Sequence, residues 1–106
     1  MYITNAFSLN MISDRVCAAG RASFREISVS EAIELAQRLE SAVGHPDTAA
    51  VFTDVLGSEV KVNRMMIALN EGDSLLVGQY RGPRLPEGAK TLPEGATIKW
   101  YLVEIY

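Results

Sequence analysis

Residues 28–39 read Ser-Val-Ser-Glu-Ala-Ile-Glu-Leu-Ala-Gln-Arg-Leu, and this stretch decides the fold. Ser28 and Glu31 have the spacing of a capping box, in which the serine caps a backbone N–H and the glutamate reaches back to the cap residue. The apolar residues that follow have helical spacing; they are Ala32, Ile33, Leu35, Ala36 and Leu39. The stretch therefore predicts a helix that ends near Ser41 and Ala42.

A second helix is predicted immediately downstream, after the short connector Val43-Gly44-His45. Pro46 suits the first helical position, because the N–H that proline lacks is not needed there. Asp47 favours the same helix N-terminus electrostatically. Gly57 is a natural terminating residue. Together these signals bound a helix whose apolar stripe is Ala49, Ala50, Phe52, Val55 and Leu56.

Extended segments surround the two helices. We expect strands at residues 1–8, 22–27, 61–69, 74–80 and 98–105, with hairpin turn chemistry at Asn70-Glu71-Gly72-Asp73. Alternating helices and strands in a short chain predict one α/β (α+β) domain over residues 1–106, with a mixed sheet of about five strands and two or more helices packed on it. Residues 81–97 form a Pro/Gly-rich loop in which Leu-Pro-Glu-Gly-Ala occurs at 85–89 and again at 92–96. We interpret the second copy as duplicated turn chemistry.

Composition narrows the function classes. The 106 residues suit a single domain, and the net charge of −3 argues against sequence-blind binding to long nucleic acid, including DNA. The single cysteine, Cys17, allows no internal disulfide and is expected to be a small buried residue. The sequence has neither a signal-peptide pattern nor an apolar run of membrane-spanning length, so we expect a cytoplasmic protein with no membrane partner.

Several familiar chemistries are missing from the sequence. One His and one Cys cannot form a typical zinc site, and no acidic cluster is evident for paired Mg²⁺ ions. There is no phosphate-loop, dinucleotide-binding or nucleophile-elbow motif. We therefore expect no metal and no cofactor. A catalyst built from this sequence must use its single histidine with polar and basic neighbours.

His45 is the most informative residue, because it precedes a helix N-terminus where free N–H groups favour a phosphate. The helix dipole favours the neutral imidazole, whereas a bound phosphate favours the protonated form. A histidine in that balance can serve as a general acid near neutral pH. The alternative is a surface or helix-capping histidine.

Other candidates are basic or polar. Arg84 lies on the stiff Pro/Gly loop, where a guanidinium can fork onto phosphate oxygens, and Glu87 can orient Arg84 or His45. The alternative is a solvated salt bridge on a rigid surface loop. Arg64, in the predicted strand 61–69, faces either a site or solvent. Further small polar candidates for binding bases, sugars or phosphates are Asn5, Ser8, Asn10 and Thr48, with turn or helix capping as their alternative. Trp100 and Tyr101 are expected in the core or an interface, and Met65 and Met66 as gap-filling strand residues.

Three segments, residues 5–11, 41–49 and 81–88, together resemble the ring nucleases that archaeal viruses encode as type III anti-CRISPR proteins, and their bacterial relatives. The resemblance spans nearly the whole chain. It implies a homodimer that binds cyclic tetra-adenylate across its interface and cleaves it, without metal, to linear di-adenylates, which switches off type III CRISPR signalling. The resemblance also implies that His45 is the general acid and that Arg84 and Glu87 act at the phosphate. It matches Asn5, Ser8, Asn10 and Arg64 to ligand-binding positions, with Gln79 and Thr48 as secondary candidates.

The implied chemistry agrees with the residues present. RNA supplies its own nucleophile, the 2′-hydroxyl group, so the enzyme needs to add charge stabilisation and a proton donor. Two other function classes stay open on the sequence. One is a module that sequesters the cyclic nucleotide without cutting it, and the other is a small interaction protein of a mobile element.

Overall fold

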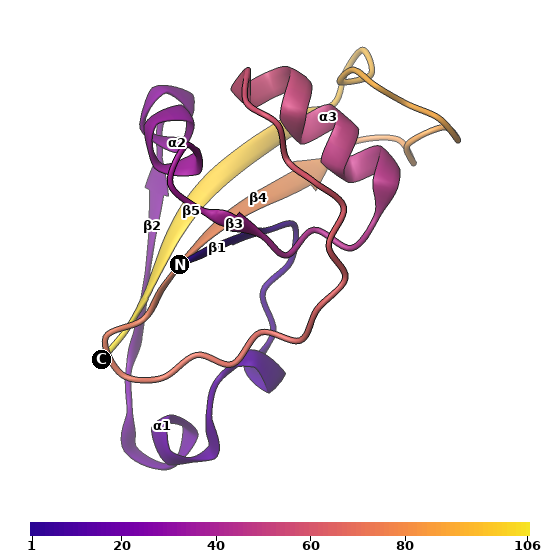
Figure 1. Ribbon diagram of the computed structural model, residues 1–106. Helices are drawn as coiled ribbons and strands as arrows, with labels where there is room; N and C mark the ends of the chain where they lie inside the picture. Colours follow the sequence, from indigo (N-terminus) through magenta and orange to yellow (C-terminus); the bar gives the residue numbers. More distant parts are fainter.

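The computed structural model describes the backbone of residues 1–106 and all side chains except those of Arg15 and Cys17, so the expectation for Cys17 lies outside the described side chains. One five-stranded sheet, in the order β2-β5-β4-β1-β3, forms the centre of the molecule (Figure 1). Its strands are β1 (Tyr2–Thr4), β2 (Ala22–Ile27), β3 (Glu40–Ser41), β4 (Ser74–Arg81) and β5 (Thr97–Ile105).

The sheet is mixed, as predicted. β1 runs parallel to both of its neighbours, with Tyr2 opposite Glu40 in β3 and opposite Leu75 in β4. β5 runs antiparallel to β4 and β2, so the longest strand ties the two halves of the sheet together. The single α+β domain with a five-stranded mixed sheet and helices packed on it is confirmed.

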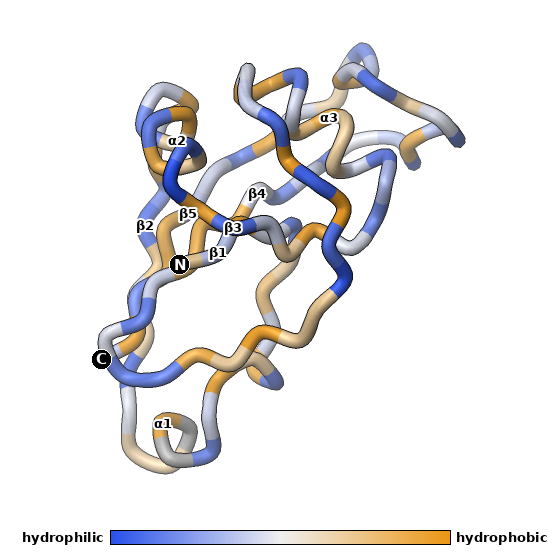
Figure 2. The backbone as a smooth tube through the Cα atoms, viewed as in Figure 1, coloured by the Kyte–Doolittle hydropathy of each residue, from blue (hydrophilic) through white to orange (hydrophobic). Residues whose placement is uncertain are grey.

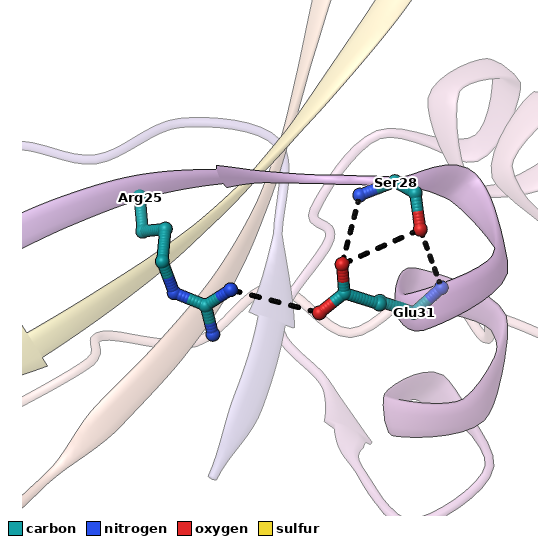
Figure 3. Close-up of polar contacts among 3 residues, drawn as sticks. All are labelled: Arg25, Ser28 and Glu31. Carbon is teal, nitrogen blue, oxygen red and sulfur yellow. Dashed lines mark hydrogen bonds and ion pairs between the residues drawn. The ribbon is translucent and has the colours of Figure 1, made fainter.

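The two predicted helices cover one face of the sheet (Figure 1). α2 (Val29–Ala36) begins with the expected capping box, in which the Glu31 N–H donates to the Ser28 hydroxyl oxygen over 3.1 Å and the Ser28 N–H donates to the Glu31 carboxylate over 3.5 Å. Arg25 on β2 adds an exposed ion pair to Glu31 at 3.6 Å (Figure 3). α3 (Pro46–Leu56) begins at Pro46 and ends at Gly57 with φ 69°, both as predicted.

The main core lies between these helices and the sheet. Phe52 on α3 packs on Trp100 of β5 with ring centroids 5.0 Å apart. Gly78 on β4 makes this tilted ring contact possible, because a Cβ there would lie 2.5 Å from Trp100 and 2.7 Å from Phe52. Trp100 is 2% exposed, which confirms that it belongs to the core.

The opposite face carries a second apolar cluster. Val16 of α1 (Asp14–Ala19) packs there with Ile67 and Leu69 of the extended segment 61–69. This segment follows an irregular backbone path from the end of α3 to the turn before β4 (Figure 2), and its residues 61–63 lie beside residues 41–43 at the β3 edge of the sheet. The buried side chains there are Val16, Ala42, Ile67, Leu69, Leu75, Val77, Val103 and Ile105. Among the described residues, no helix combines the length and apolar character that a bilayer crossing requires.

Four local predictions are wrong. Residues 61–69 form isolated bridges, Val43 with Val62 and Ile12 with Leu69, instead of a strand, so the turn at 70–73 leads into β4 without closing a hairpin. The first strand covers Tyr2–Thr4 and not residues 1–8. The helix α2 ends at Ala36, because residues 40–41 pair with β1. The short helix α1, capped by the Ser13 side chain, was not predicted.

The methionine pair also differs from expectation. Met66 is 94% exposed and Met65 is 37% exposed, so neither fills a gap between strands. The alternating apolar pattern of this segment comes from Ile67 and Leu69, which point onto the sheet. A segment that covers a sheet face can therefore carry the same alternation as a strand within the sheet.

The repeated Leu-Pro-Glu-Gly-Ala segments fold as two equivalent turns, which confirms their interpretation as duplicated turn chemistry. Ala89 donates to the Pro86 carbonyl and Ala96 donates to the Pro93 carbonyl, each over 3.0 Å. Gly88 and Gly95 have φ of 79° and 81°, the conformation that a type II turn requires at its third residue. The two turns present Glu87 and Glu94 at matched positions.

Candidate functional site

The sheet topology gathers the candidate residues at one edge. Because β1 lies parallel to β3 and β4, the carboxyl ends of these three neighbouring strands point the same way. Asn5 follows β1, His45 follows β3 after a short connector, and the Pro/Gly loop follows β4. Crevices outside the carboxyl ends of strands are the usual ligand sites of open α/β sheets. The sequence therefore brings distant polar residues to a place suited to a ligand.

An open pocket of about 470 Å³ lies between the start of α3 and the loop after β4. His45, Arg84 and Glu87 line it together with Asp47, Leu85 and Pro86. The three residues proposed for catalysis thus share one pocket. Their side chains are exposed, and in the described part of the chain no hydrogen bond or ion pair joins them.

His45 occupies the residue before the first turn of α3, in extended conformation with φ −119° and ψ 126°. Its described side chain makes no capping hydrogen bond to that helix. The helix-capping alternative for His45 is therefore wrong, and the imidazole is an exposed group at the pocket. The backbone carbonyl of His45, in contrast, accepts from Ala49 over 3.0 Å and fixes the residue to the helix.

The loop is tied to the start of α3 by one hydrogen bond. The Gly88 N–H donates to the Asp47 carboxylate over 3.1 Å. At the other end of the loop segment, the Tyr80 hydroxyl donates to the Pro83 carbonyl. Arg84, Leu85, Pro86 and Glu87 lie between these two attachments, so the chain that faces His45 is held at both ends.

A third attachment places Arg64 next to this region. The Asn63 N–H donates to the Val43 carbonyl, and the Asn63 side-chain amide donates to the Ser41 carbonyl, each over 2.8 Å. Arg64 then lies against Gly44, where a Cβ would come within 3.1 Å of the arginine Cγ. Because Gly44 has no side chain, the aliphatic part of Arg64 can pack against the backbone immediately before His45.

A second open pocket, of about 420 Å³, lies on the face of the sheet opposite α2 and α3. Asn5 and Gln79 provide polar groups to it, and Phe24 and Tyr101 provide aromatic surface. Phe7 contacts Phe24 edge-to-face, with centroids 5.4 Å apart. Aromatic walls with a few amides suit a planar, hydrogen-bonding ligand such as a nucleobase. The remaining lining residues are Ala6, Val77 and Val103.

Three predicted binding residues, in addition to Arg64, stand apart from both pockets. Ser8 precedes the short 3₁₀ helix η1 (Leu9–Met11), and Asn10 is an exposed member of it. Thr48 is half-buried in the first turn of α3. Within the described side chains, none of these three lines either pocket.

The sequence assigns no site role to two residues of this region, Asp47 and Phe24, whereas Tyr101 packs against the second core cluster as expected. Asp47 was read as a helix-start residue, and its partner Gly88 is too distant in sequence for any local pattern to reveal. Phe24 and Tyr101 are diagonal neighbours on the antiparallel β2–β5 pair, where Phe24 lies opposite Val103 and Tyr101 opposite Glu26. Phe24 is 60% exposed in the structure, and no local pattern in the sequence indicates this exposure.

The arrangement around His45 combines an imidazole, a guanidinium and the two carboxylates of Asp47 and Glu87 at the N-terminus of an 11-residue helix. An imidazolium can deliver a proton, and a guanidinium can bind a phosphate through two parallel hydrogen bonds. The helix N-terminus adds favourable potential for an anion. The pocket is therefore chemically suited to phosphodiesters.

Comparisons of the sequence and of the fold with known proteins find similar viral proteins. The solved structure of B116 of Sulfolobus turreted icosahedral virus (STIV) superposes with a TM-score of 0.80 at 26% identity, covering 97% of each chain. A segment of 54 residues, 49% of this chain, is 43% identical to "Uncharacterized protein 26" of Sulfolobus islandicus filamentous virus (isolate Iceland/Hveragerdi). This match spans 46% of that viral protein, which is less than half its length. The sequence pattern of the STIV B116-like family matches residues 1–101, and the chain therefore belongs to this family, which has viral members.

Proposed function

We propose that this protein is a ring nuclease that cleaves cyclic tetra-adenylate to linear di-adenylates without a metal ion. The observation that carries the proposal is the shared pocket of His45, Arg84 and Glu87 at the edge where three parallel strands end. These residues come from two separate segments of the chain, the start of α3 and the loop after β4. Their convergence gives a proton donor and a phosphate-binding group in one place.

The reaction needs no external nucleophile. A ribose 2′-oxygen attacks the adjacent phosphorus, and the bond from phosphorus to the 5′-oxygen breaks. The 2′-hydroxyl proton passes to solvent, and the 5′-oxygen takes a proton from the His45 imidazolium. The products carry a 2′,3′-cyclic phosphate at one end and a 5′-hydroxyl at the other.

Charge develops on the phosphate oxygens during this attack. Arg84 stabilises that charge through its planar guanidinium, and the start of α3 adds a favourable potential. Glu87 keeps the guanidinium or the imidazole oriented once the ligand is bound. Arg64, which packs beside Gly44, contacts a further phosphate of the same ring.

A homodimer completes the scheme. Its two-fold axis presents two copies of His45 to a ring with four phosphates, so that two opposite cuts give two equal halves. The pocket lined by Asn5 and Gln79 receives adenine, because its amides and aromatic walls suit a base. Removal of the ring would switch off type III CRISPR signalling in the host cytoplasm.

The decisive experiment incubates the protein with cyclic tetra-adenylate in EDTA and separates the products by chromatography. We expect linear di-adenylates from the wild-type protein and an intact, bound ring with His45→Ala. A ring of 2′-deoxyadenylates is expected to bind and stay whole, because it lacks the nucleophile. Full activity of the His45→Ala protein would exclude the proposed mechanism.

A second candidate function is sequestration of the ring without cleavage. The separate pocket with Asn5, Gln79, Phe24 and Tyr101 favours it, since this pocket offers binding groups without a proton donor. Sequestration predicts that the wild-type protein binds the ring and releases it unchanged. It also predicts that His45→Ala alters affinity at most, so the same experiment separates the two functions.

A further inference from the structure

Two turns of identical sequence and geometry lie on the loop between β4 and β5, but their attachments differ. The first turn is bound to α3, because the Gly88 N–H donates to the Asp47 carboxylate over 3.1 Å. The second turn places Gly95 at the equivalent position, with φ 81° against 79° for Gly88. Among the described side chains, no carboxylate accepts from the Gly95 N–H. The hydrogen bond to Asp47 therefore depends on where the first turn lies in the fold, because the second turn has the same local sequence.

The acceptor stands on the same short segment as His45. Asp47 follows His45 after Pro46, whose ring restricts the backbone between them. The N-terminal half of α3 is anchored in the core through Ala49 and Phe52, which are 2% and 0% exposed. A loop that is bound to Asp47 is thereby positioned relative to the backbone that carries His45.

We propose that Asp47 is a positioning residue, which holds the first turn of the loop so that Arg84 and Glu87 face His45. The inference rests on the proposed function, and it adds a residue whose role is geometric. Arg84 and Glu87 share the pocket with Asp47, and Glu87 immediately precedes the bound Gly88. Loss of the bond frees the turn and moves both side chains away from the imidazole.

Asp47 also lies in the first turn of a helix, where a carboxylate is stabilising through the helix dipole alone. Three variants separate the two roles. Asp47→Ala removes both the acceptor and the charge, whereas Asp47→Asn removes the charge and keeps an oxygen acceptor. Asp54→Ala removes an exposed carboxylate from the same helix and serves as the matched control.

The first measurement is amide hydrogen exchange by NMR. In Asp47→Ala we expect the Gly88 amide to exchange about fivefold faster or more, while the Gly95 amide keeps its wild-type rate. The Asp47→Asn and Asp54→Ala proteins are expected to keep the wild-type rate at both glycines. An unchanged Gly88 rate in Asp47→Ala would overturn the attachment.

The second measurement follows the chemistry with cyclic tetra-adenylate. Asp47→Ala is expected to lower kcat by about 10-fold to 100-fold with a smaller change in KM, as misplacement of catalytic groups does. Asp47→Asn is expected to restore most of kcat, which a purely electrostatic role at the helix end would not allow. Faster exchange of Gly88 with an unchanged kcat would overturn the positioning role.

A third readout is independent of cleavage. His45 is the single histidine, so its imidazole gives one set of NMR signals. These signals are expected to shift in Asp47→Ala and to stay in place in Asp54→Ala. If the wild-type protein leaves the ring intact, the proposed function fails, whereas the positioning role is still decided by Gly88 exchange and the His45 signals. Unchanged His45 signals in Asp47→Ala would contradict it.

Discussion

Arg64 lies directly against Gly44, and a Cβ added to that glycine would come within 3.1 Å of the arginine Cγ. The contact joins two segments that are distant in sequence, since residues 41–43 are hydrogen-bonded to residues 61–63. It places the aliphatic part of the Arg64 side chain beside the residue that precedes the candidate general acid. The absence of a side chain at Gly44 is therefore expected to matter for ligand binding more than for folding.

Gly44→Ala tests this contact. The arginine is exposed and can shift by a few tenths of an ångström, so we expect the unfolding free energy to change by less than about 1 kcal/mol. Affinity for cyclic tetra-adenylate, measured by titration calorimetry, is expected to fall about tenfold, because Arg64 moves away from the phosphate that we propose it binds. The effect should vanish in the Arg64→Ala background, as coupled residues require. Equal losses in both backgrounds would contradict the coupling.

Arg84 and Arg81 form a natural pair for testing phosphate recognition. Both are exposed, but Arg84 lines the pocket with His45 and Arg81 ends β4 outside its lining. We expect Arg84→Ala to lower kcat by about 10²-fold to 10³-fold, and Arg84→Lys to recover part of it, because lysine lacks the planar fork. Steady-state kinetics on Arg81→Ala should stay within about twofold of wild type. Similar losses for the two alanine variants would argue against a role for the pocket.

Glu87 and Glu94 provide a second matched comparison, because they occupy the same position in two equivalent turns. Glu87→Gln is expected to slow single-turnover cleavage, since it alters the carboxylate beside His45 and Arg84. Glu94→Gln is expected to leave the rate unchanged. Both residues are exposed, so thermal unfolding should stay at wild-type values. Equal cleavage rates for Glu87→Gln and Glu94→Gln would show that Glu87 has no special role in the pocket.

Gly78→Ala addresses the core beneath the site. The added methyl group would lie 2.5 Å from Trp100 and 2.7 Å from Phe52, so the two rings must move apart. We expect urea unfolding to show a loss of about 1–3 kcal/mol, which is typical of overpacked cores. Phe52→Leu in the same chain is expected to relieve part of the strain, giving a double variant more stable than the sum of the single losses. If the losses of unfolding free energy in the two single variants simply add, the added methyl group is not accommodated by movement of the two rings.

The elements that the sequence predicted well have their signals within a few residues. Ser28 and Glu31 make the capping box at the start of α2 (Figure 3), and Pro46 and Gly57 bound α3. Capping and turn chemistry are local, so neither depends on which strand lies next to which. The prediction of duplicated turns around Gly88 and Gly95 was correct for the same reason, because turn signals are local.

The elements that were predicted wrongly depend on contacts with residues distant in the sequence. The extended segment 61–69 has strand-like alternation, but Ile67 and Leu69 bury themselves on the sheet face instead of joining the sheet. Glu40 and Ser41 became a strand because Tyr2 and Ile3 lie beside them, which no pattern in residues 28–42 indicates. The bond from Gly88 to Asp47 is of the same kind. The sequence therefore names the candidate residues, which stay a prediction, whereas the contacts that position them depend on the fold.

The placement of β1 between β3 and β4 has a consequence for how the molecule assembles. Tyr2 pairs with Glu40 on one side and with Leu75 on the other, so this strand has no partner close to it in the chain. Pairings between distant segments carry a large loop-closure cost and slow the search for the native state. The edge that gathers His45, Asn5 and the Pro/Gly loop is therefore expected to form late in folding, after the antiparallel β4–β5 pair has closed.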